Sequence, residues 1–302
     1  MTNLGNPGAT GNSVFPTTTE GFSAMGVTTL TPGAPAPGSR PAQVSTNNGS
    51  RWSNGWVKLG LGMILPALIL LAWQLSTAAG LFSPVQLPSP RAVFEAGTEL
   101  ISRNELFSHV AISTQRVLLG FLAGAALGVS LGALVGLSKI AEVLLGPTIG
   151  ALRAVPSLAW VPLLILWMKI GEDSKVTLIV IGAFFPVFTT VSLALRHVDK
   201  NLVEAARAFG LQGLKLLTTV QLPAVVPAIF SGLRLALAQA WLFLVAAELI
   251  ASSMGLGFLL TDSQNNGRTD RLLLAIVLLA VLGKATDALL GLAEKWAVRR
   301  WS

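Results

Sequence analysis

Six long apolar runs restrict what this chain can fold into more than any other feature of its sequence. A helix needs about 20 residues to cross the roughly 30 Å hydrocarbon core of a bilayer, and inside lipid the backbone must satisfy its own hydrogen bonds. Each run is long enough for such a helix. The runs are residues 58–79, 109–137, 143–168, 175–195, 224–250 and 271–295. The sequence therefore predicts an all-α polytopic membrane protein with about six transmembrane helices.

The third run differs from the others because it contains Arg153, Pro156 and Pro162. Proline removes a backbone hydrogen bond and clashes with the preceding helical turn. Irregular backbone at membrane depth is tolerated only where protein or a water-filled cavity surrounds it. We therefore expect residues 143–168 to be kinked or partly re-entrant.

The composition agrees with a membrane protein and argues against several other classes. Hydrophobic residues make up 52% of the chain and charged residues 12%, whereas soluble domains carry about 25% charged residues. The chain has no cysteine, which excludes disulfides and a cysteine nucleophile, and its two histidines argue against a histidine metal site. We predict no metal site and no catalytic residue. Despite a net charge of +7, the basic residues are scattered between the runs, so we expect no nucleic-acid binding.

Two further segments lie before the second run. Residues 1–50 are rich in Gly, Pro, Ser, Thr and Asn and cannot bury enough apolar surface to offset their ordering entropy. We predict a disordered tail there, either a tether or a partner-binding segment, and a transmembrane domain over 51–302. Residues 87–106 follow an amphipathic pattern, which predicts a helix on the membrane surface. Its apolar residues recur at roughly helical spacing and are Val93, Phe94, Leu100 and Ile101.

The distribution of Lys and Arg predicts the orientation of the chain. If the amino terminus is inside, twelve of the 21 Lys and Arg fall in inner segments and six in outer segments, with Arg116, Arg234 and Lys284 left inside runs. The positive-inside rule then places both termini in the cytoplasm. Residues 196–223, between the fourth and fifth runs, lie on the same side.

A polar, helix-prone stretch, EAARAFGLQGLKLLTTVQLP, occupies residues 204–223. Asp199 and Asn201 are suitable N-caps for a first short helix. Gly210 permits a turn between two helices, and we expect Pro223 to end the second. The small side chains after Glu204 would let another surface approach closely. The residues whose types and spacing define the pattern of this stretch are Glu204, Ala205, Ala206, Gly210, Val220, Leu222 and Pro223. The side of the second helix that we expect to face the protein consists of Leu211, Leu214, Leu216, Leu217 and Val220.

This pattern resembles the EAA loop of permease subunits in bacterial ABC importers. Most of the chain, roughly residues 58–296, is similar to the nitrate/sulfonate/taurine/bicarbonate group of these permeases, and most similar to the aliphatic-sulfonate permeases. The residues 1–50 are not part of the family pattern. The segments that carry the resemblance are LPSP at 87–90, HVAISTQRVLLGF at 109–121, LRAVPSLAWVPLLILW at 152–167, GLRLALAQAW at 232–241, AAELI at 246–250 and LGKATD at 282–287.

The resemblance implies a type I ABC importer permease fold over 51–302 and a cytoplasmic coupling loop over 196–223. It implies a multi-pass protein of the bacterial inner membrane that works with two ATP-binding subunits, a periplasmic or lipoprotein substrate-binding protein and a second copy of the permease. The chain contains no GxxxxGK[ST] phosphate-binding loop. We therefore expect no cofactor on this chain and ATP-Mg on the partner subunits. The residues that the resemblance assigns to ATPase coupling are Glu204, Ala205, Ala206, Gly210, Leu222 and Pro223.

Several charged residues inside the runs are candidates for the translocation pathway. An ionised group at mid-membrane costs about 2.5–3.5 kcal/mol on insertion scales, so each should face protein or water. The candidates, with one residue from the semi-polar segment 251–270, are Arg116, Arg234, Glu248, Asn265 and Lys284. We hypothesise that Arg116 or Arg234 is a transient charge partner for an anion.

Each of these assignments has a structural alternative. Lys284 and Asp287 are three residues apart and could simply pair with each other. Glu248 could pair with Arg116 or Arg234, or line the pathway. The segment 251–270 is either a plain connection or a gate.

Glycine recurs at every fourth position of the second run, at Gly120, Gly124, Gly128, Gly132 and Gly136. Small residues on one face let membrane helices pack closely. We expect this ridge to be a packing surface, with a sliding contact as the functional alternative.

Two other functions compete with the importer permease. A secondary transporter driven by an ion gradient would be expected to show internal repeats, which the sequence lacks, and it would leave the 204–223 pattern unexplained. An intramembrane enzyme would need a nucleophile with a base, or a metal site. For the cargo, we expect a small anion, with sulfonate first and taurine, nitrate or bicarbonate as alternatives.

Overall fold

The computed structural model describes residues 55–301, and the tail predicted over 1–50 lies outside them. Every regular element in the described part of the chain is a helix. Five helices are long and apolar enough to cross a membrane. They are α1 (Gly55–Ala78), α3 (Glu105–Leu137), α6 (Glu172–Arg196), α9 (Leu222–Ala251) and α11 (Thr269–Trp301). The prediction of an all-α polytopic membrane protein is confirmed.

The third predicted span is a bent pair of helices. α4 (Lys139–Ala154) and the segment Ser157–Met168, which ends in α5 (Trp160–Met168), pass the length and hydropathy test together but are bent by 81°. Pro156 lies between them, where its missing N–H group and fixed φ interrupt the helix. The predicted kink is therefore present.

Helices α3 and α6 pack against each other through the glycine ridge of α3. A β-carbon on Gly124 would lie 2.6 Å from the Val180 carbonyl oxygen, and one on Gly128 would lie 2.8 Å from Val187 Cβ. Comparable close approaches occur from Gly120 to Gly136. The ridge is a packing surface, as predicted, because only glycine lets the two backbones come this close.

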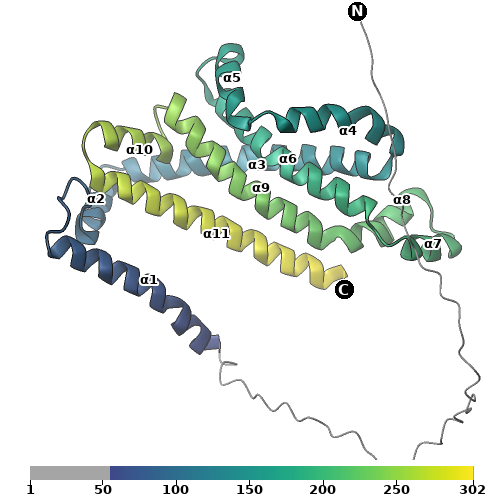
Figure 1. The fold of residues 1–302 in the computed structure, drawn as a ribbon, viewed down its shortest axis with the longest axis horizontal. Helices are drawn as coiled ribbons and strands as arrows, with labels where there is room; N and C mark the ends of the chain where they lie inside the picture. The colour runs from purple at the N-terminus through teal and green to yellow at the C-terminus, as the bar shows by residue number, and fades with distance from the viewer. Residues whose placement is uncertain (1–54, 302) are drawn as a thin grey trace, which may run out of the picture. The chain divides into compact units, whose positions relative to one another are not determined.

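Helix α9 lies beside α6 and α11, and its buried side chains complete the core (Figure 1). Ala236, Ala240 and Leu244 are fully buried there. Trp241 is also buried, and its Nε1 donates to Thr286 Oγ1 on α11 at 3.0 Å. In contrast, α1 has no buried residue in its apolar window and α11 has few, so both helices leave apolar surface for lipid or protein.

Helix α2 (Pro90–Ser102) confirms the helix predicted within 87–106, but its apolar residues divide between two environments. Ser89 caps it by accepting from the Ala92 N–H group. Val93 and Leu100 are buried, whereas Phe94 and Ile101 are exposed. Leu100 belongs to a cluster with residues of α11 and of α10 (Leu256–Asn265). The prediction of a purely membrane-surface helix is therefore incomplete, because one side of α2 packs against protein.

The short helices lie at opposite ends of the long ones. α10 (Leu256–Asn265) and α2 lie at one end, here named the α10 end. α7 (Lys200–Ala208) and α8 (Gly213–Leu216) lie at the other, here named the α7 end (Figure 1). The two groups of short helices are therefore separated by the length of the long helices, and each group carries one part of the candidate site described below.

Candidate functional site

The first part of the site is the 196–223 segment at the α7 end. Asp199 is the N-cap of α7, and its Oδ1 accepts from the Asn201 N–H group at 2.9 Å. Asn201 itself lies within the helix rather than at its cap. After α7 the chain turns at Gly210, whose φ is +81°, and enters α8 at Gly213, whose φ is +54°. The predicted pair of short helices with a glycine turn is confirmed.

The predicted end of the second helix at Pro223 is wrong. α8 continues through a π-helical turn, Leu217–Gln221, directly into α9, so that Gly213–Ala251 is one helical run. The Leu222 N–H group donates to the Leu217 carbonyl five residues back. Pro223 then occupies the first turn of α9. Pro223 therefore lies inside the run, directly after the π-helical turn, rather than at a helix end.

The 196–223 segment presents an apolar surface that the sequence analysis did not predict. Glu204 and Ala205 are exposed, whereas Ala206 is buried. Phe209 is 88% exposed and Leu214 is 74% exposed. Of the side predicted to face the protein, Leu216 is buried and Leu211, Leu217 and Val220 are half-buried, whereas Leu214 is exposed. The available signal was a phenylalanine at the end of a short helix, directly before a turn glycine.

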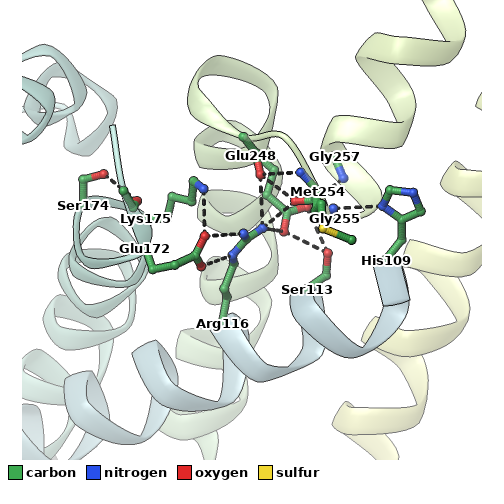
Figure 2. Close-up of polar contacts among 12 residues, drawn as sticks. His109, Ser113, Arg116, Glu172, Ser174, Lys175, Glu248, Met254, Gly255 and Gly257 are labelled. Atoms are coloured by element: carbon green, nitrogen blue, oxygen red, sulfur yellow. Dashed lines mark hydrogen bonds and ion pairs between the residues drawn. The ribbon is translucent and has the colours of Figure 1, made fainter. Parts of the chain in front are cut away.

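The second part of the site is a polar cluster at the α10 end (Figure 2). α3 supplies three side chains at helical spacing on one face, and α6 and α9 supply the others. Backbone N–H groups at the start of α10 complete it. The side chains of the polar cluster are His109, Ser113, Arg116, Glu172, Lys175 and Glu248.

Glu248 is the centre of this cluster. Its side chain is 0% exposed, and it accepts from Arg116 Nη1 at 2.6 Å. It also accepts from Ser113 Oγ at 2.9 Å and from the Gly257 N–H group at 2.8 Å. A buried carboxylate requires such a set of partners, because an unpaired buried charge is strongly destabilising. Of the alternatives left open, Glu248 thus pairs with Arg116 rather than Arg234.

The same cluster caps α10. The Gly255 N–H group donates to His109 Nδ1 at 3.0 Å, and the Leu256 N–H group donates to Ser113 Oγ at 2.8 Å. With the bond from Gly257 to Glu248, three successive N–H groups at this helix start have side-chain acceptors. A carboxylate at a helix N-terminus is also favoured by the helix dipole. The central half of the segment 251–270 is therefore a helix whose start is attached to α3 and α9.

Arg116 also contacts a second carboxylate. Its Nε and Nη2 donate to Oε2 and Oε1 of Glu172, both at 2.6 Å, and its Nη1 donates to the Met254 carbonyl at 2.7 Å. Lys175 Nζ lies 3.0 Å from Glu172 Oε1 and is buried. The Arg116 side chain is 5% exposed, whereas the Glu172 side chain is 61% exposed. Beside this pair lies a cavity of about 300 Å³.

The other pathway candidates lie elsewhere. Arg234 on α9 donates to both oxygens of Asp287 on α11, at 2.8 and 2.9 Å. Lys284 Nζ lies farther from Asp287, at 3.5 Å from its Oδ2. The expected pair of Lys284 and Asp287 is therefore weaker than the pair of Arg234 and Asp287. Arg234 and Lys284 line one cavity of about 760 Å³, together with Lys295 and Arg299 near the end of α11. Asn265 is exposed at the end of α10, away from both groups.

Comparison with known proteins identifies the class to which this architecture belongs. The model of the family described as binding-protein-dependent transport system inner membrane component matches residues 124–299. The chain belongs to this family and is a multi-pass permease component of an ABC importer.

Individual relatives narrow the group within this family. The chain is 42% identical over 265 residues to a Bacillus subtilis (strain 168) protein described as an aliphatic sulfonates transport permease, SsuC, covering 87% of this chain and 95% of the relative. It is 35% identical over 231 residues to the taurine transport system permease TauC of Escherichia coli (strain K12), covering 75% and 83%. The chain is thus a member of the group that the sequence analysis predicted.

A solved structure of the MetNI methionine ABC transporter shares the fold. The likeness has a TM-score of 0.50 and 23% identity, and it covers 67% of this chain and 96% of that chain. At this identity it concerns the fold alone, which confirms the predicted importer permease architecture.

Proposed function

We propose that this permease imports an aliphatic sulfonate, and that a partner ATPase drives it by docking on the 196–223 segment. The observation that carries the coupling role is the apolar surface at the α7 end, where Phe209 and Leu214 project from a turn held by Gly210. Exposed apolar residues beside small ones fit a helix pair that enters a groove on another protein. Glu204 and Ala205 lie on the same exposed element.

The continuity of α8 with α9 supports a mechanism for this coupling. A displacement of the docked loop would move the helical run Gly213–Ala251 as one body, because the run contains no break. From Leu222 to Glu248 this run spans on the order of 40 Å at 1.5 Å per residue. Motion at the α7 end would thus reach the polar cluster and change access to the pathway. ATP-Mg is held by the partner in this proposal, since the chain lacks a phosphate-binding loop.

We assign the α7 end to the cytoplasm, with both chain termini on that side. Lys200, Arg207 and Lys215 lie in the short helices of this end, and Arg299 and Arg300 lie in the last turn of α11. With Lys139, Arg196 and Lys295, they outnumber the six basic residues of the predicted outer segments, as the positive-inside rule requires. The α10 end then faces the substrate-binding protein.

We further propose that two copies of the chain form the pathway. α1 and α11 expose apolar surface that the rest of the described chain does not cover and that is unfavourable in contact with water. A second copy would cover part of it, and the cavity beside Arg234 and Lys284 would then lie near the pathway between copies. Its lining carries four cations against two carboxylates, Asp287 and Glu294, and this excess of positive charge suits an anion on its way to the cytoplasm.

The substrate can be tested by growth and uptake. Deletion of the gene should abolish growth with ethanesulfonate as the sole sulfur source and preserve growth with sulfate. Taurine, nitrate and bicarbonate are the alternative cargoes of this group and would each give a different growth defect. Normal growth on ethanesulfonate after deletion would contradict the sulfonate assignment.

The coupling role can be tested separately with the purified complex. Phe209→Asp should prevent co-purification of the ATPase, because it places a charge in the apolar contact. Phe94→Asp is the matched control, since it changes another exposed phenylalanine at the opposite end of the bundle. Equal ATPase recovery with both variants would contradict docking at this segment. In a separate transport assay, uptake driven by an ion gradient without ATP would favour a secondary transporter.

A further inference from the structure

Arg116 is held by two carboxylates that differ in their surroundings. Glu248 is inaccessible, whereas the Glu172 side chain is 61% exposed. If Glu248 moved away from Arg116, it would lose its hydrogen bonds with Ser113 and Gly257 and would become an unpaired charge in the core. Glu172 can instead rotate into water, which solvates the carboxylate that it exposes. Only the Glu172 side of Arg116 can therefore exchange its partner.

The charge of the polar cluster suits such an exchange. Arg116 and Lys175 are balanced by Glu172 and Glu248, so the four groups together are neutral. Departure of Glu172 would leave one net positive charge on two side chains that are buried. A buried excess cation is unfavourable by itself, so the vacated position would favour a monoanion.

The geometry of the vacated position specifies the kind of anion. Nε and Nη2 of Arg116 each lie 2.6 Å from one oxygen of Glu172, which is the paired arrangement that the guanidinium group forms with oxyanions. Lys175 Nζ adds a donor 3.0 Å from one of these oxygens. A sulfonate group offers two oxygens in the same arrangement and a third for another donor. Glu172 thus presents to Arg116 the same pair of oxygens that a sulfonate head would present.

The neighbouring cavity can accept the rest of such a ligand. It has a volume of about 300 Å³ and contains both Arg116 and Glu172 in its lining. Most of its other lining is apolar and would contact a short alkyl chain, while the Gln115 amide and the Ser253 hydroxyl are available for polar contacts. These remaining residues include Ile112, Gln115, Leu119, Val176 and Met254.

We propose that Arg116 and Lys175 form a subsite for the sulfonate head of the cargo, and that Glu172 occupies this subsite until cargo displaces it. This inference rests on the proposed function, because it takes the cargo to be a sulfonate and the α10 end to be the outer side. A subsite that Glu172 occupies differs in one testable respect from an ion pair with a purely structural role. Glu172 competes with the cargo, so its removal should improve binding rather than impair it.

The test uses the complete transporter, with its ATPase and binding protein, in phosphatidylcholine liposomes. The variant Glu172→Gln keeps the size of the side chain and removes the competing charge. It should lower the KM for ethanesulfonate uptake by up to about tenfold, as expected if the subsite is open in about a tenth of the empty molecules. Asp173→Asn is the control, since it removes a neighbouring exposed charge from the same helical turn. Lys175→Gln should raise the KM.

Four outcomes separate the inference from its alternatives. A lower KM with Glu172→Gln and an unchanged KM with Asp173→Asn supports it. Equal KM values for both variants and the wild type overturn it, while wild-type uptake leaves the proposed function intact. Absence of ethanesulfonate uptake by the wild type overturns both. If Glu172→Gln changes only the retention of phosphatidylglycerol added to the liposomes, the ligand is a lipid head group and the cargo subsite is overturned.

Discussion

Arg234 on α9 and Asp287 on α11 form a two-point ion pair, with Nε 2.8 Å from Oδ1 and Nη2 2.9 Å from Oδ2. The pair joins two helices that also meet through apolar contacts, the bond from Trp241 to Thr286 and a longer contact of 3.5 Å between Arg234 Nη1 and Glu294 Oε2. Paired hydrogen bonds of this kind fix orientation as well as adding energy. The pair therefore sets how α11 lies against α9.

This relationship predicts that the charges can be exchanged but not removed singly. Asp287→Arg should weaken uptake and lower the thermal stability of the purified protein, because it places two cations together. The double variant Arg234→Asp/Asp287→Arg should recover part of both, because the pair re-forms while Glu294 and Lys284 each face a charge of their own sign. Lys284→Gln is the comparison, since Lys284 reaches Asp287 only at 3.5 Å and should matter little to stability. Failure of the double variant to recover any stability would show that the pair is not an independent link.

The contact between α3 and α6 predicts a sharp sensitivity to added methyl groups. A β-carbon on Gly128 would lie 2.8 Å from Val187 Cβ and 3.0 Å from the Phe184 carbonyl oxygen. Gly128→Ala should destabilise the protein by about 1–3 kcal/mol through overpacking. Gly146→Ala on α4 meets no atom within 4 Å and should be close to neutral. Unfolding in mixed micelles, followed by circular dichroism, would measure both; equal stability of the two variants would contradict the packing argument.

The two ends of α10 each have a glycine with positive φ nearby, and alanine should destabilise the protein to a different extent at each. Gly255 has a φ of +125°, and its β-carbon would overlap Glu248 Oε1, whereas Gly267 has a φ of +66° and open space around it. Gly267→Ala should cost about 1 kcal/mol from backbone strain alone. Gly255→Ala should cost more, because it adds a clash with a buried carboxylate. Thermal stability of the two variants checks the order, and a reversed order would show that α10 can move away from α9.

The attachment of α2 predicts a dependence on pH. The Arg268 guanidinium, with help from Arg271, holds the pKa of the Glu99 carboxyl below its ordinary value. A carboxyl with a lowered pKa in the folded state stabilises that state above its unfolded pKa, and the contribution is lost as pH falls through the folded pKa. Amide exchange in α2, corrected for its intrinsic pH dependence, should therefore accelerate below about pH 4.

A matched pair of variants isolates this effect. Glu99→Gln should remove the acid-dependent step, whereas Glu95→Gln should keep it, because Glu95 contacts only the exposed Arg91 on the same helix. An identical acid response in the wild type and Glu99→Gln would exclude Glu99 as its cause.

The sequence predicted those features that depend on the position of residues along one helix. Bilayer thickness fixes the length of a span, so the apolar runs predicted the long helices closely. Pro156 predicted the break between α4 and α5 because proline acts on its own backbone. The glycines of α3 predicted close packing because their spacing alone places them on one face.

Features that depend on how helices are rotated against each other were not predictable in the same way. Arg116 and Arg234 were equally suitable partners for Glu248 until the packing placed Arg116 beside it. The capping of α10 by α3 joins residues about 140 positions apart. Leu214 was assigned to the wrong side, because it directly follows Gly213, and the positive φ values of Gly210 and Gly213 set the direction in which the chain enters α8.

The unbroken passage from α8 into α9 predicts that coupling can be interrupted without loss of docking. Thr219 lies in the π-helical turn Leu217–Gln221 and is exposed. Thr219→Pro should break the helix there, at a local cost of about 3 kcal/mol, while leaving the exposed surface around Phe209 unchanged. The complex should then assemble and hydrolyse ATP, but each sulfonate imported should require more ATP. Thr219→Ala keeps the helix and should behave like the wild type. The measurement is the ratio of phosphate released to sulfonate taken up in liposomes, and an unchanged ratio in Thr219→Pro would mean that force reaches the membrane helices by another route, such as α6.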